Sequence, residues 1–475
     1  MHRPSSIVGA DKTRRPILTL LSVLALSLGL LASGPAVAGH NDDIHSPNAR
    51  KLDREPFQAG EDSHAKGSDL AFQGRLVVAG AYEGVGFFRR VNGGNGLQQI
   101  SFYDCPGAQG DVSIIGDYVF VSIDSPGSNS KQTQVCNNTG TNSSDSSLGK
   151  EGIRIVDISD IRNPHQVAFV ETECGSHTHT LIPKGDTTFM YVDSYPIQQT
   201  ASCNDVNHPE GEFSVLRFPT ADPTRARIVS TPDVIPATAT DAVGCHDTGV
   251  LIRPAKRDLA AAACLGAFAI LNIERPANPK VLSVVQNPFM ELDHSGGLTW
   301  DGKVAIISDE HAGAAGGGGC SPDSDSQVGA MWYYDISRPR HPELKGHFSL
   351  PRIPPADSPE ELERFRCTTH NWNVLPTRNQ SRYVAVSAYY SGGLAAVDFS
   401  DPTNPKEYAH YLPQVKGINP DMWSAYWYNG RVHSNEHASQ LGLSTFKIDG
   451  LGIRNVHFFD HRLNPQTQVV AGLAR

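Results

Sequence analysis

The sequence predicts an all-β fold, a seven-bladed β-propeller built from four-stranded blades. Three observations support this prediction. A short strand-and-turn motif recurs along the chain, hairpin turn signals precede its copies, and Gly and Pro are frequent, with 44 and 32 copies among 475 residues. Frequent turn residues between short alternating segments favour strands over long helices. Four-stranded units repeated around an axis form a propeller.

Residues 1–38 are predicted to be an export signal. A basic segment ends in RR (14–15), ILTLLSVLALSLGLLA (17–32) is apolar, and AVA (36–38) has the pattern of a cleavage site. The arginine pair fits either a twin-arginine signal, which serves proteins exported already folded, or an ordinary signal. The apolar segment is short for a membrane span, with an uncleaved anchor as the alternative. We therefore expect a secreted, cell-surface or otherwise extracytoplasmic protein.

The mature chain is predicted to contain an N-terminal extension (39–68), one propeller (69–460) and a C-terminal tail (461–475). Without the signal it has 36 basic and 49 acidic residues, a formal charge of −13. No basic cluster stands out, so we expect no nucleic-acid partner. No further apolar segment approaches the length of a membrane helix, so we expect no transmembrane span in the mature chain. We expect a monomer.

The recurring motif is an alternating strand that ends at Asp or Asn and leads into a proline-containing turn. Proline fixes φ and stops the strand. The best copies are VDISDIRNP (156–164), LNIERPANP (271–279), YDISRPRHP (334–342) and VDFSDPTNP (397–405). Weaker copies at 216–223 and 446–449, with a first unit at FFRRVNGG (87–94), make seven units.

Two more strands precede each motif. In the fifth unit, GGLTW (296–300) and KVAIISD (303–309) flank Asp301-Gly302, and Asp-Gly between alternating segments is a strong hairpin signal. Each unit therefore holds four short strands. The ring could close with a strand near 453–459 or with one from 40–68. A sandwich or two smaller barrels are the alternative folds.

Two segments resemble the LVIVD-repeat proteins. They are GIRIVDISDIRNPHQVAFVET (152–172) and GLAAVDFSDPTNPKEYAHY (393–411), and the resemblance extends over nearly all of 69–450. It implies a propeller fold and says almost nothing about activity.

Eight cysteines indicate disulfides, because the export signal directs the chain to an oxidising compartment. Pairing between neighbours in the sequence is the simplest arrangement, although the sequence does not exclude others. The expected pairs are Cys105–Cys136, Cys174–Cys203, Cys245–Cys264 and Cys320–Cys367. Three cysteines lie within three residues before a histidine, so thiolate ligands are the alternative, but export favours disulfides.

Four consecutive units have a histidine at the same repeat position, at the head of the strand that lines the axis. The four are His177, His246, His294 and His370. His179 lies two residues further on and faces the same side of its strand. A second set follows the next strands, in SDEHA (308–312) and SNEHA (434–438), and contributes Glu310, His311, Glu436 and His437. Hairpin geometry places both sets at one end of the propeller.

Imidazoles that converge on an axis predict a transition-metal site, with copper or iron first and zinc as a third option. The predicted ligands are His177, His179, His246, His294, His311, His370 and His437. Architecturally the site is similar to the iron-containing propellers of carotenoid oxygenases and to copper-linked selenium-binding or methanethiol-oxidase propellers. The predicted function is a metal-dependent oxidoreductase acting on an unidentified small molecule.

Two alternative functions remain open. A metal-dependent hydrolase or lyase would use Glu310 or Glu436 as the catalytic base. A non-catalytic cell-surface or extracellular binding scaffold would use the same histidines as hydrogen-bonded groups that line a water-filled channel.

Overall fold

The structure is a computed structural model. The residues it describes are 43–60, 63–107, 109–124, 151–195, 212–235, 244–253, 256–310, 320, 329–375, 382–451 and 462–469. The chain divides into two compact units, 1–36 and 37–475, and the first lies outside the described residues together with the rest of the predicted signal. Of the helices that are described, none has the length and apolar character to cross a membrane.

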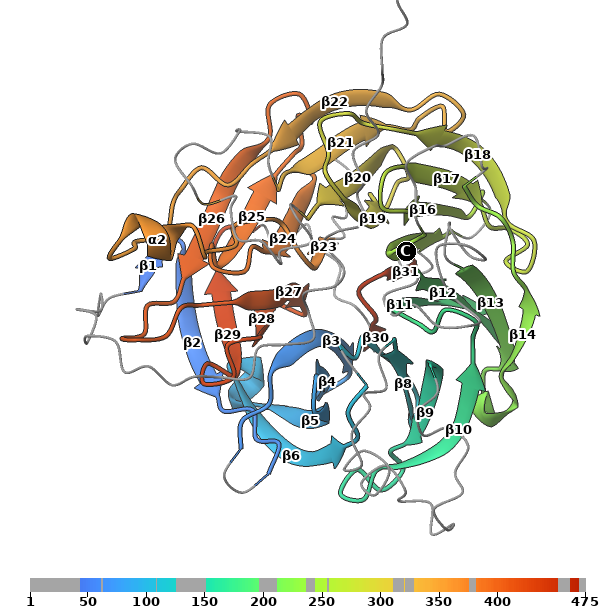
Figure 1. The fold of residues 1–475 in the computed structure, drawn as a ribbon, viewed down its shortest axis with the longest axis horizontal. Coiled ribbons are helices and arrows are strands. Elements are labelled where there is room, and N and C mark those ends of the chain that lie inside the picture. Colours follow the sequence, from blue (N-terminus) through green and yellow to red (C-terminus); the bar gives the residue numbers. More distant parts are fainter. Residues whose placement is uncertain are drawn as a thin grey trace, which may run out of the picture. The chain divides into compact units, whose positions relative to one another are not determined.

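The second unit is a β-propeller, which confirms the all-β prediction. Its described strands form sheets arranged around a central axis (Figure 1). The first sheet has the order β30-β3-β4-β5-β6 and the second the order β10-β9-β8-β7. Their strands are β30 (Arg462–Leu463), β3 (Gly67–Gln73), β4 (Leu76–Ala81), β5 (Gly84–Val91), β6 (Gly96–Asp104), β7 (Val112–Ile115), β8 (Tyr118–Ile123), β9 (Gly152–Asp157) and β10 (His165–Glu171).

The third sheet has the order β11-β12-β13-β14, with β11 (Thr178–Lys184), β12 (Thr187–Ser194), β13 (Glu212–Pro219) and β14 (Arg227–Ser230). A larger sheet follows, in which the runs β18-β17-β16-β15 and β19-β20-β21-β22 meet through one parallel pair, Asp247 with Ser295. Its strands are β15 (Asp247–Ile252), β16 (Leu259–Ala263), β17 (Phe268–Asn272), β18 (Lys280–Val285), β19 (Asp293–Leu298), β20 (Val304–Asp309), β21 (Met331–Asp335) and β22 (Glu343–Phe348), joined at β15 by β31 (Thr467–Val469).

The last two sheets have the orders β1-β26-β25-β24-β23 and β2-β29-β28-β27. Their strands are β1 (Ile44–His45), β23 (Trp372–Val374), β24 (Val384–Ala388), β25 (Leu394–Asp398), β26 (Lys406–Leu412), β2 (Ala49–Glu55), β27 (Met422–Tyr428), β28 (Arg431–Glu436) and β29 (Leu443–Ile448). The described helices are single turns, η2 (Asn92–Gly94), η3 (Pro223–Arg225) and α2 (Pro359–Leu362).

Hairpin chemistry and apolar packing explain this arrangement. Between β27 and β28, Asn429 and Gly430 both have positive φ, as a two-residue hairpin turn requires. Apolar side chains then fill the space between neighbouring sheets. For example, Val78 and Val85 of the first sheet share a buried cluster with Val119 of the second. Burying such contacts stabilises the fold by roughly 25 cal/mol per Å² of apolar surface.

The N-terminal extension closes the ring. Strand β2 pairs antiparallel with β29, from Ala49 opposite Ile448 to Glu55 opposite Leu443. Of the two closures left open by the sequence, the structure therefore has the one that uses a strand from 40–68. Strand β1 adds a further edge strand to β26.

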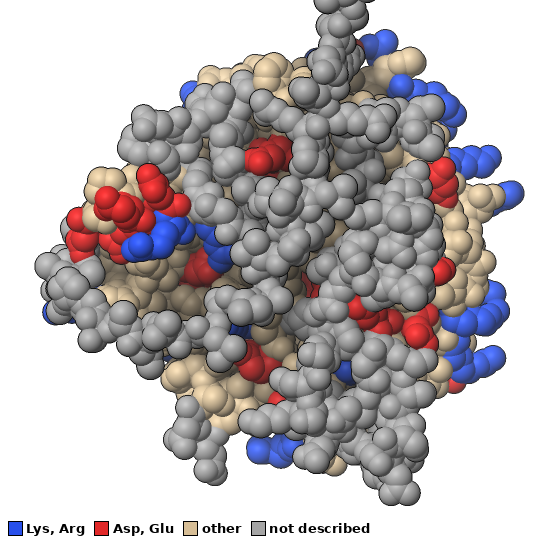
Figure 2. Space-filling view, in the orientation of Figure 1, with Lys and Arg blue, Asp and Glu red and all other residues tan. Residues whose placement is uncertain are grey.

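The end of the chain returns to the inner strands of the propeller. Strand β30 pairs with β3, and β31 pairs parallel with β15. Between them, Asn464 donates to the carbonyl of Ile114 at 3.1 Å and accepts from its N–H at 2.9 Å. Residues 462–469 are thus part of the packed fold, although the sequence suggested only a tail. On the face in Figure 2, Lys and Arg side chains are spread along the rim, near Asp and Glu.

Candidate metal centre

Four histidines from four successive inner strands form a row. His177 and His246 directly precede β11 and β15, His294 lies in β19, and His370 precedes β23. Along the row, the ring centroids are 4.2 Å apart for His177 and His246, 4.0 Å for His246 and His294, and 4.5 Å for His294 and His370. All four side chains are buried. The common repeat position therefore places the four imidazoles side by side.

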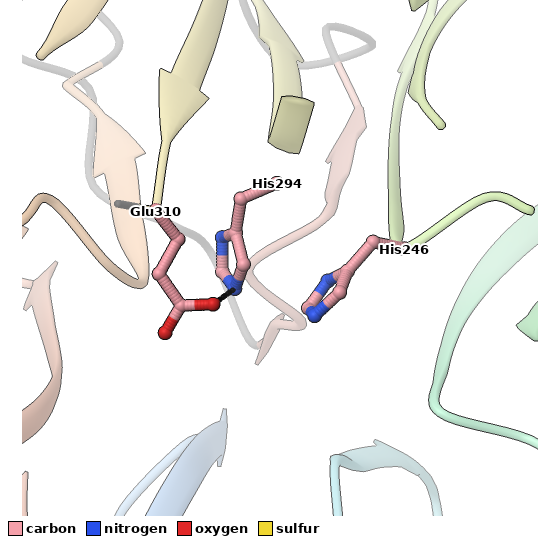
Figure 3. A group of neighbouring side chains, drawn as sticks. All are labelled: His246, His294 and Glu310. Carbon is pink, nitrogen blue, oxygen red and sulfur yellow. Dashed lines mark ion pairs between the residues drawn. The ribbon is translucent and has the colours of Figure 1, made fainter. Parts of the chain in front are cut away.

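Glu310, just after β20, reaches the middle of the row. Its carboxylate oxygens lie 3.5 Å from Nε2 of His294 and 3.6 Å from Nε2 of His370. Figure 3 shows Glu310 and the rings of His246 and His294 pointing toward a common space. One ligand atom from each of these three residues lies within 4.8 Å of the others. Such a group is compact enough to hold a metal ion.

The outer histidines are oriented through their second nitrogens. Nδ1 of His177 lies 2.5 Å from Asp124 Oδ2, and Nδ1 of His370 donates to the carbonyl of Trp423 at 2.6 Å. Because a carbonyl only accepts, Nδ1 of His370 bears the proton, and the neutral ring keeps its lone pair on Nε2. Metal-binding histidines are commonly oriented in this way, by a hydrogen bond from the nitrogen that does not bind the metal.

Among the described residues, several polar atoms at the centre of the row have no hydrogen-bond partner. Both ring nitrogens of the fully buried His294, Nδ1 of His246 and both carboxylate oxygens of Asp247 are in this state. Asp247 Oδ2 lies 3.8 Å from Nδ1 of His246. Leaving such groups buried and unpaired costs about 1–3 kcal/mol each. The chemistry of this donor set therefore fits a bound cation.

Burial also keeps most of these imidazoles neutral. It lowers the pKa of His246 to about 3 and that of His294 to about 4, and it lowers the pKa of His370 well below its usual range. For His177, burial lowers the pKa, but the hydrogen bond and charge of Asp124 outweigh it and the net pKa is raised. Neutral imidazoles are the form that binds metals.

Aromatic side chains surround the row. The Tyr195 ring lies 5.0 Å from that of His177, and the Trp423 ring lies 4.4 Å from that of His370. Tyr390 packs on His370 at 4.5 Å and donates its hydroxyl to Glu310 Oε1 at 2.7 Å. Tyr390 has a positive φ of 45°, a conformation that costs a non-glycine residue about 1–3 kcal/mol and is often found at functional sites. Tyr390 therefore holds the carboxylate of Glu310 in place.

Two disulfides lie beside the histidines. Cys245–Cys264 adjoins His246, and Cys320–Cys367 ends three residues before His370. Both pairs were predicted and are confirmed, which rules out thiolate ligands from Cys245 and Cys367. Cys105 and Cys174 are also disulfide-bonded, but their predicted partners, Cys136 and Cys203, lie outside the described residues.

The LVIVD repeat family matches residues 382–412. This segment of the chain is similar to the LVIVD repeat. The matched residues include 393–411, one of the two segments whose sequence resembles the LVIVD-repeat proteins. No curated protein matches the chain.

Many solved structures are similar in fold. The Cps50 (Swd1) β-propeller domain of Myceliophteria thermophila has 8% identity and a TM-score of 0.46, and the match covers 81% of this chain and 97% of that one. Sqt1 of Saccharomyces cerevisiae has 7% identity, a TM-score of 0.45 and coverages of 81% and 83%. A hypothetical selenium-binding protein from Sulfolobus tokodaii has 9% identity, a TM-score of 0.47 and coverages of 74% and 83%. At such identities and scores, the likeness says nothing about activity.

His179 does not join the row, contrary to the prediction. Its Nε2 lies 2.6 Å from the hydroxyl of Ser113 and its Nδ1 lies 2.8 Å from that of Ser122. With both ring nitrogens in hydrogen bonds, this histidine has a structural role on the inner strand. The sequence could not show this, because both serines belong to the preceding sheet.

The second predicted set is only partly brought to the site. Glu310 reaches the row, whereas Glu436 accepts a hydrogen bond from the backbone of Asp421 at 3.1 Å. The ring of His437 packs against Tyr82 at 4.9 Å. Neither Glu436 nor His437 belongs to the three-residue group, and His311 lies outside the described residues.

Sequence reasoning missed Asp247 and Tyr390 altogether. Asp247 directly follows His246, so its place beside the row could have been inferred from adjacency. Tyr390 follows β24, and nothing in the sequence distinguishes it from the neighbouring Tyr389. Its contact with Glu310 joins two different units of the repeat.

Proposed function

We propose that the protein is a metal-dependent oxidoreductase whose metal lies on the propeller axis and whose substrate is a small molecule. One observation supports this most strongly. His246, His294 and Glu310 converge within 4.8 Å, while both nitrogens of the fully buried His294 have no hydrogen-bond partner in the described ranges. His177 and His370 flank this group and are its further candidate ligands.

The donor set favours a redox metal. Two imidazoles and one carboxylate are the ligands that non-haem iron(II) oxygenases use, and imidazole-rich sites also suit copper, with zinc a further option. When bound, iron or copper supplies one-electron chemistry or activates oxygen. The protein's own groups supply the orientation. Trp423 fixes the ring of His370 through its carbonyl, and Tyr390 fixes Glu310 through its hydroxyl.

Glu310 is better suited to be a ligand than a base. Its oxygens already face two imidazoles and accept the Tyr390 hydroxyl. Glu436, the other base expected for a hydrolase or lyase, is engaged with the backbone of Asp421. These contacts favour oxidoreductase over hydrolase or lyase. The aromatic surroundings of Tyr195, Tyr390 and Trp423 suit a small substrate with apolar or aromatic surface.

We also infer the finer architecture and the location. Four-stranded runs that begin at β3, β7, β11, β15, β19, β23 and β27 would make seven four-stranded blades, with β15 and β19 belonging to separate blades despite their one shared pair. The disulfides near His246 and His370 are compatible with a secreted or extracytoplasmic monomer.

Metal content and redox response test this function. We expect the full chain, purified without chelators, to hold about one iron or copper ion, with an electron paramagnetic resonance signal that changes reversibly on reduction. A His246→Ala/His294→Ala variant should lose more than about 90% of the metal. The matched control is His341→Ala, which removes an exposed histidine in the turn after β21.

Three results would count against the proposal. Metal below about 0.1 ion per chain in the wild type would favour the binding scaffold. Zinc alone would favour a hydrolase or lyase. Equal metal loss in the His341→Ala control would show that the row is not the site.

A further inference from the structure

A second polar layer lies on the axis, separate from the histidine row. It consists of Asp69, Asp111, Asn371 and Tyr426, from four different inner strands or the residues before them. All four are fully buried, with at most 2% of their surface exposed. Buried carboxylates normally need a positive partner or a close set of donors. The two carboxylates of this layer therefore need such a partner.

The contacts in this layer converge on Asp69. Tyr426 donates its hydroxyl to Asp69 Oδ1 at 2.5 Å, and Asn371 Nδ2 points at the same oxygen from 3.4 Å. The carboxyl group of Asp111 is within hydrogen-bonding reach of Asp69, and burial raises the pKa of both groups. Two like-charged groups in direct contact away from water repel each other unless a proton or a cation lies between them.

Two oxygen acceptors of this layer are unpaired. Within the described part of the chain, Oδ1 of Asp111 and Oδ1 of Asn371 have no hydrogen-bond partner, although both side chains are buried. The amide of Asn371 is not acidic, and its nitrogen, Nδ2, already faces Asp69. Its unpaired oxygen therefore indicates a missing positive group independently of the two carboxyl groups. The other oxygen of Asp111, Oδ2, is occupied: it accepts the backbone N–H of His179 at 2.9 Å and lies 3.1 Å from Nδ1 of the same histidine. The unpaired atoms of the four residues are both oxygens, which suits a hard cation.

We propose that Asp69, Asp111, Asn371 and Tyr426 bind a hard divalent cation, Ca²⁺ in the first instance. Ca²⁺ takes carboxylate, amide and carbonyl oxygens in a flexible geometry of six to eight ligands. Asn371 and Tyr426 also line a pocket, together with Ser295 and Gln466 of the C-terminal segment. Mg²⁺ would demand stricter octahedral geometry, which four strands of different sheets satisfy less readily.

Calcium binding by the full chain tests this proposal. After chelation and dialysis, the wild type should take up about one Ca²⁺ per chain in equilibrium dialysis, and saturating Ca²⁺ should raise its Tm by about 2–5 °C. Asp111→Asn should bind Ca²⁺ at least about tenfold more weakly, since it removes one of two charged ligands. The His246→Ala/His294→Ala variant should keep its Ca²⁺, because the two sites are separate.

The opposite results would overturn the proposal. If the wild type bound no Ca²⁺, the proposal would be overturned. This measurement needs no variant, so it holds even if Asp111→Asn fails to fold. Equal Ca²⁺ binding by wild type and Asp111→Asn would place the ion elsewhere, and loss of Ca²⁺ in the histidine variant would place it in the row. Stabilisation by falling pH with no effect of Ca²⁺ would mean that the two carboxyl groups share a proton instead.

Discussion

A His294→Leu variant should be at least as stable as the wild type without metal, and clearly less stable with it. Without metal, both ring nitrogens of His294 are buried and have no hydrogen-bond partner in the part of the chain that the structure describes, although Nε2 lies 3.5 Å from Glu310 Oε2. Each unpaired nitrogen costs about 1–3 kcal/mol. Leucine removes these nitrogens at similar volume, so the variant should gain about 1–2 kcal/mol in free energy of unfolding. The sign should reverse with metal, because binding at 100 times Kd stabilises only the wild type, by about 2.7 kcal/mol.

Urea unfolding with chelator and with saturating metal measures both differences. His433→Leu is the matched control, since His433 is equally buried but bonds to Thr445 Oγ1 at 3.1 Å, away from the row. Its effect should be the same in both conditions. If His294→Leu destabilised the protein equally with and without metal, His294 would be a structural core residue and not a ligand.

Ending the chain after residue 461 should destabilise the propeller by about 3–6 kcal/mol. The truncation removes the buried Leu463 and the two hydrogen bonds between Asn464 and Ile114. Burial of one leucine contributes about 1.5–3 kcal/mol, and each buried hydrogen bond about 0.5–1.5 kcal/mol. Thr467, which donates to the carbonyl of Leu181 at 2.7 Å, would be lost as well. Thermal and urea unfolding of the truncated and full chains measure the change.

A chain that ends after residue 469 is the control for this truncation, because it keeps β30 and β31. It should unfold like the full chain. An Asn464→Ala substitution should show about half of the full effect. If removal of residues 462–475 left the unfolding free energy unchanged, the pairing of β30 and β31 with the inner strands would contribute nothing to stability.

Local and periodic features of the site could be predicted from the sequence. The repeat places His177, His246, His294 and His370 at one position of successive strands, and a common register means a common height on the axis. The disulfides Cys245–Cys264 and Cys320–Cys367 also join neighbours in the sequence. Predictions of this kind depend on strand periodicity and short loops, both of which are visible in the residue pattern.

Contacts between distant parts of the chain could not be predicted. The serine hydroxyls that hydrogen-bond to His179 belong to a different sheet from the histidine. Tyr390, which donates to Glu310, likewise belongs to a different sheet from that glutamate. The C-terminal strand β30 pairs with β3, with Leu463 opposite Phe72, so the two strands come from opposite ends of the propeller sequence. None of these partners leaves a periodic signal. The same holds for the oxygen-rich layer around Asp69, whose members come from four separate strands.

The most direct test of the account is the position of the metal. We expect an anomalous difference map, recorded at the absorption edge of the metal found by elemental analysis, to show one strong peak on the propeller axis. The peak should lie about 2 Å from a ring nitrogen of His246, a ring nitrogen of His294 and a carboxylate oxygen of Glu310. A map from metal-replete crystals with no peak there, or with its peak away from these three residues, would contradict the proposed metal centre.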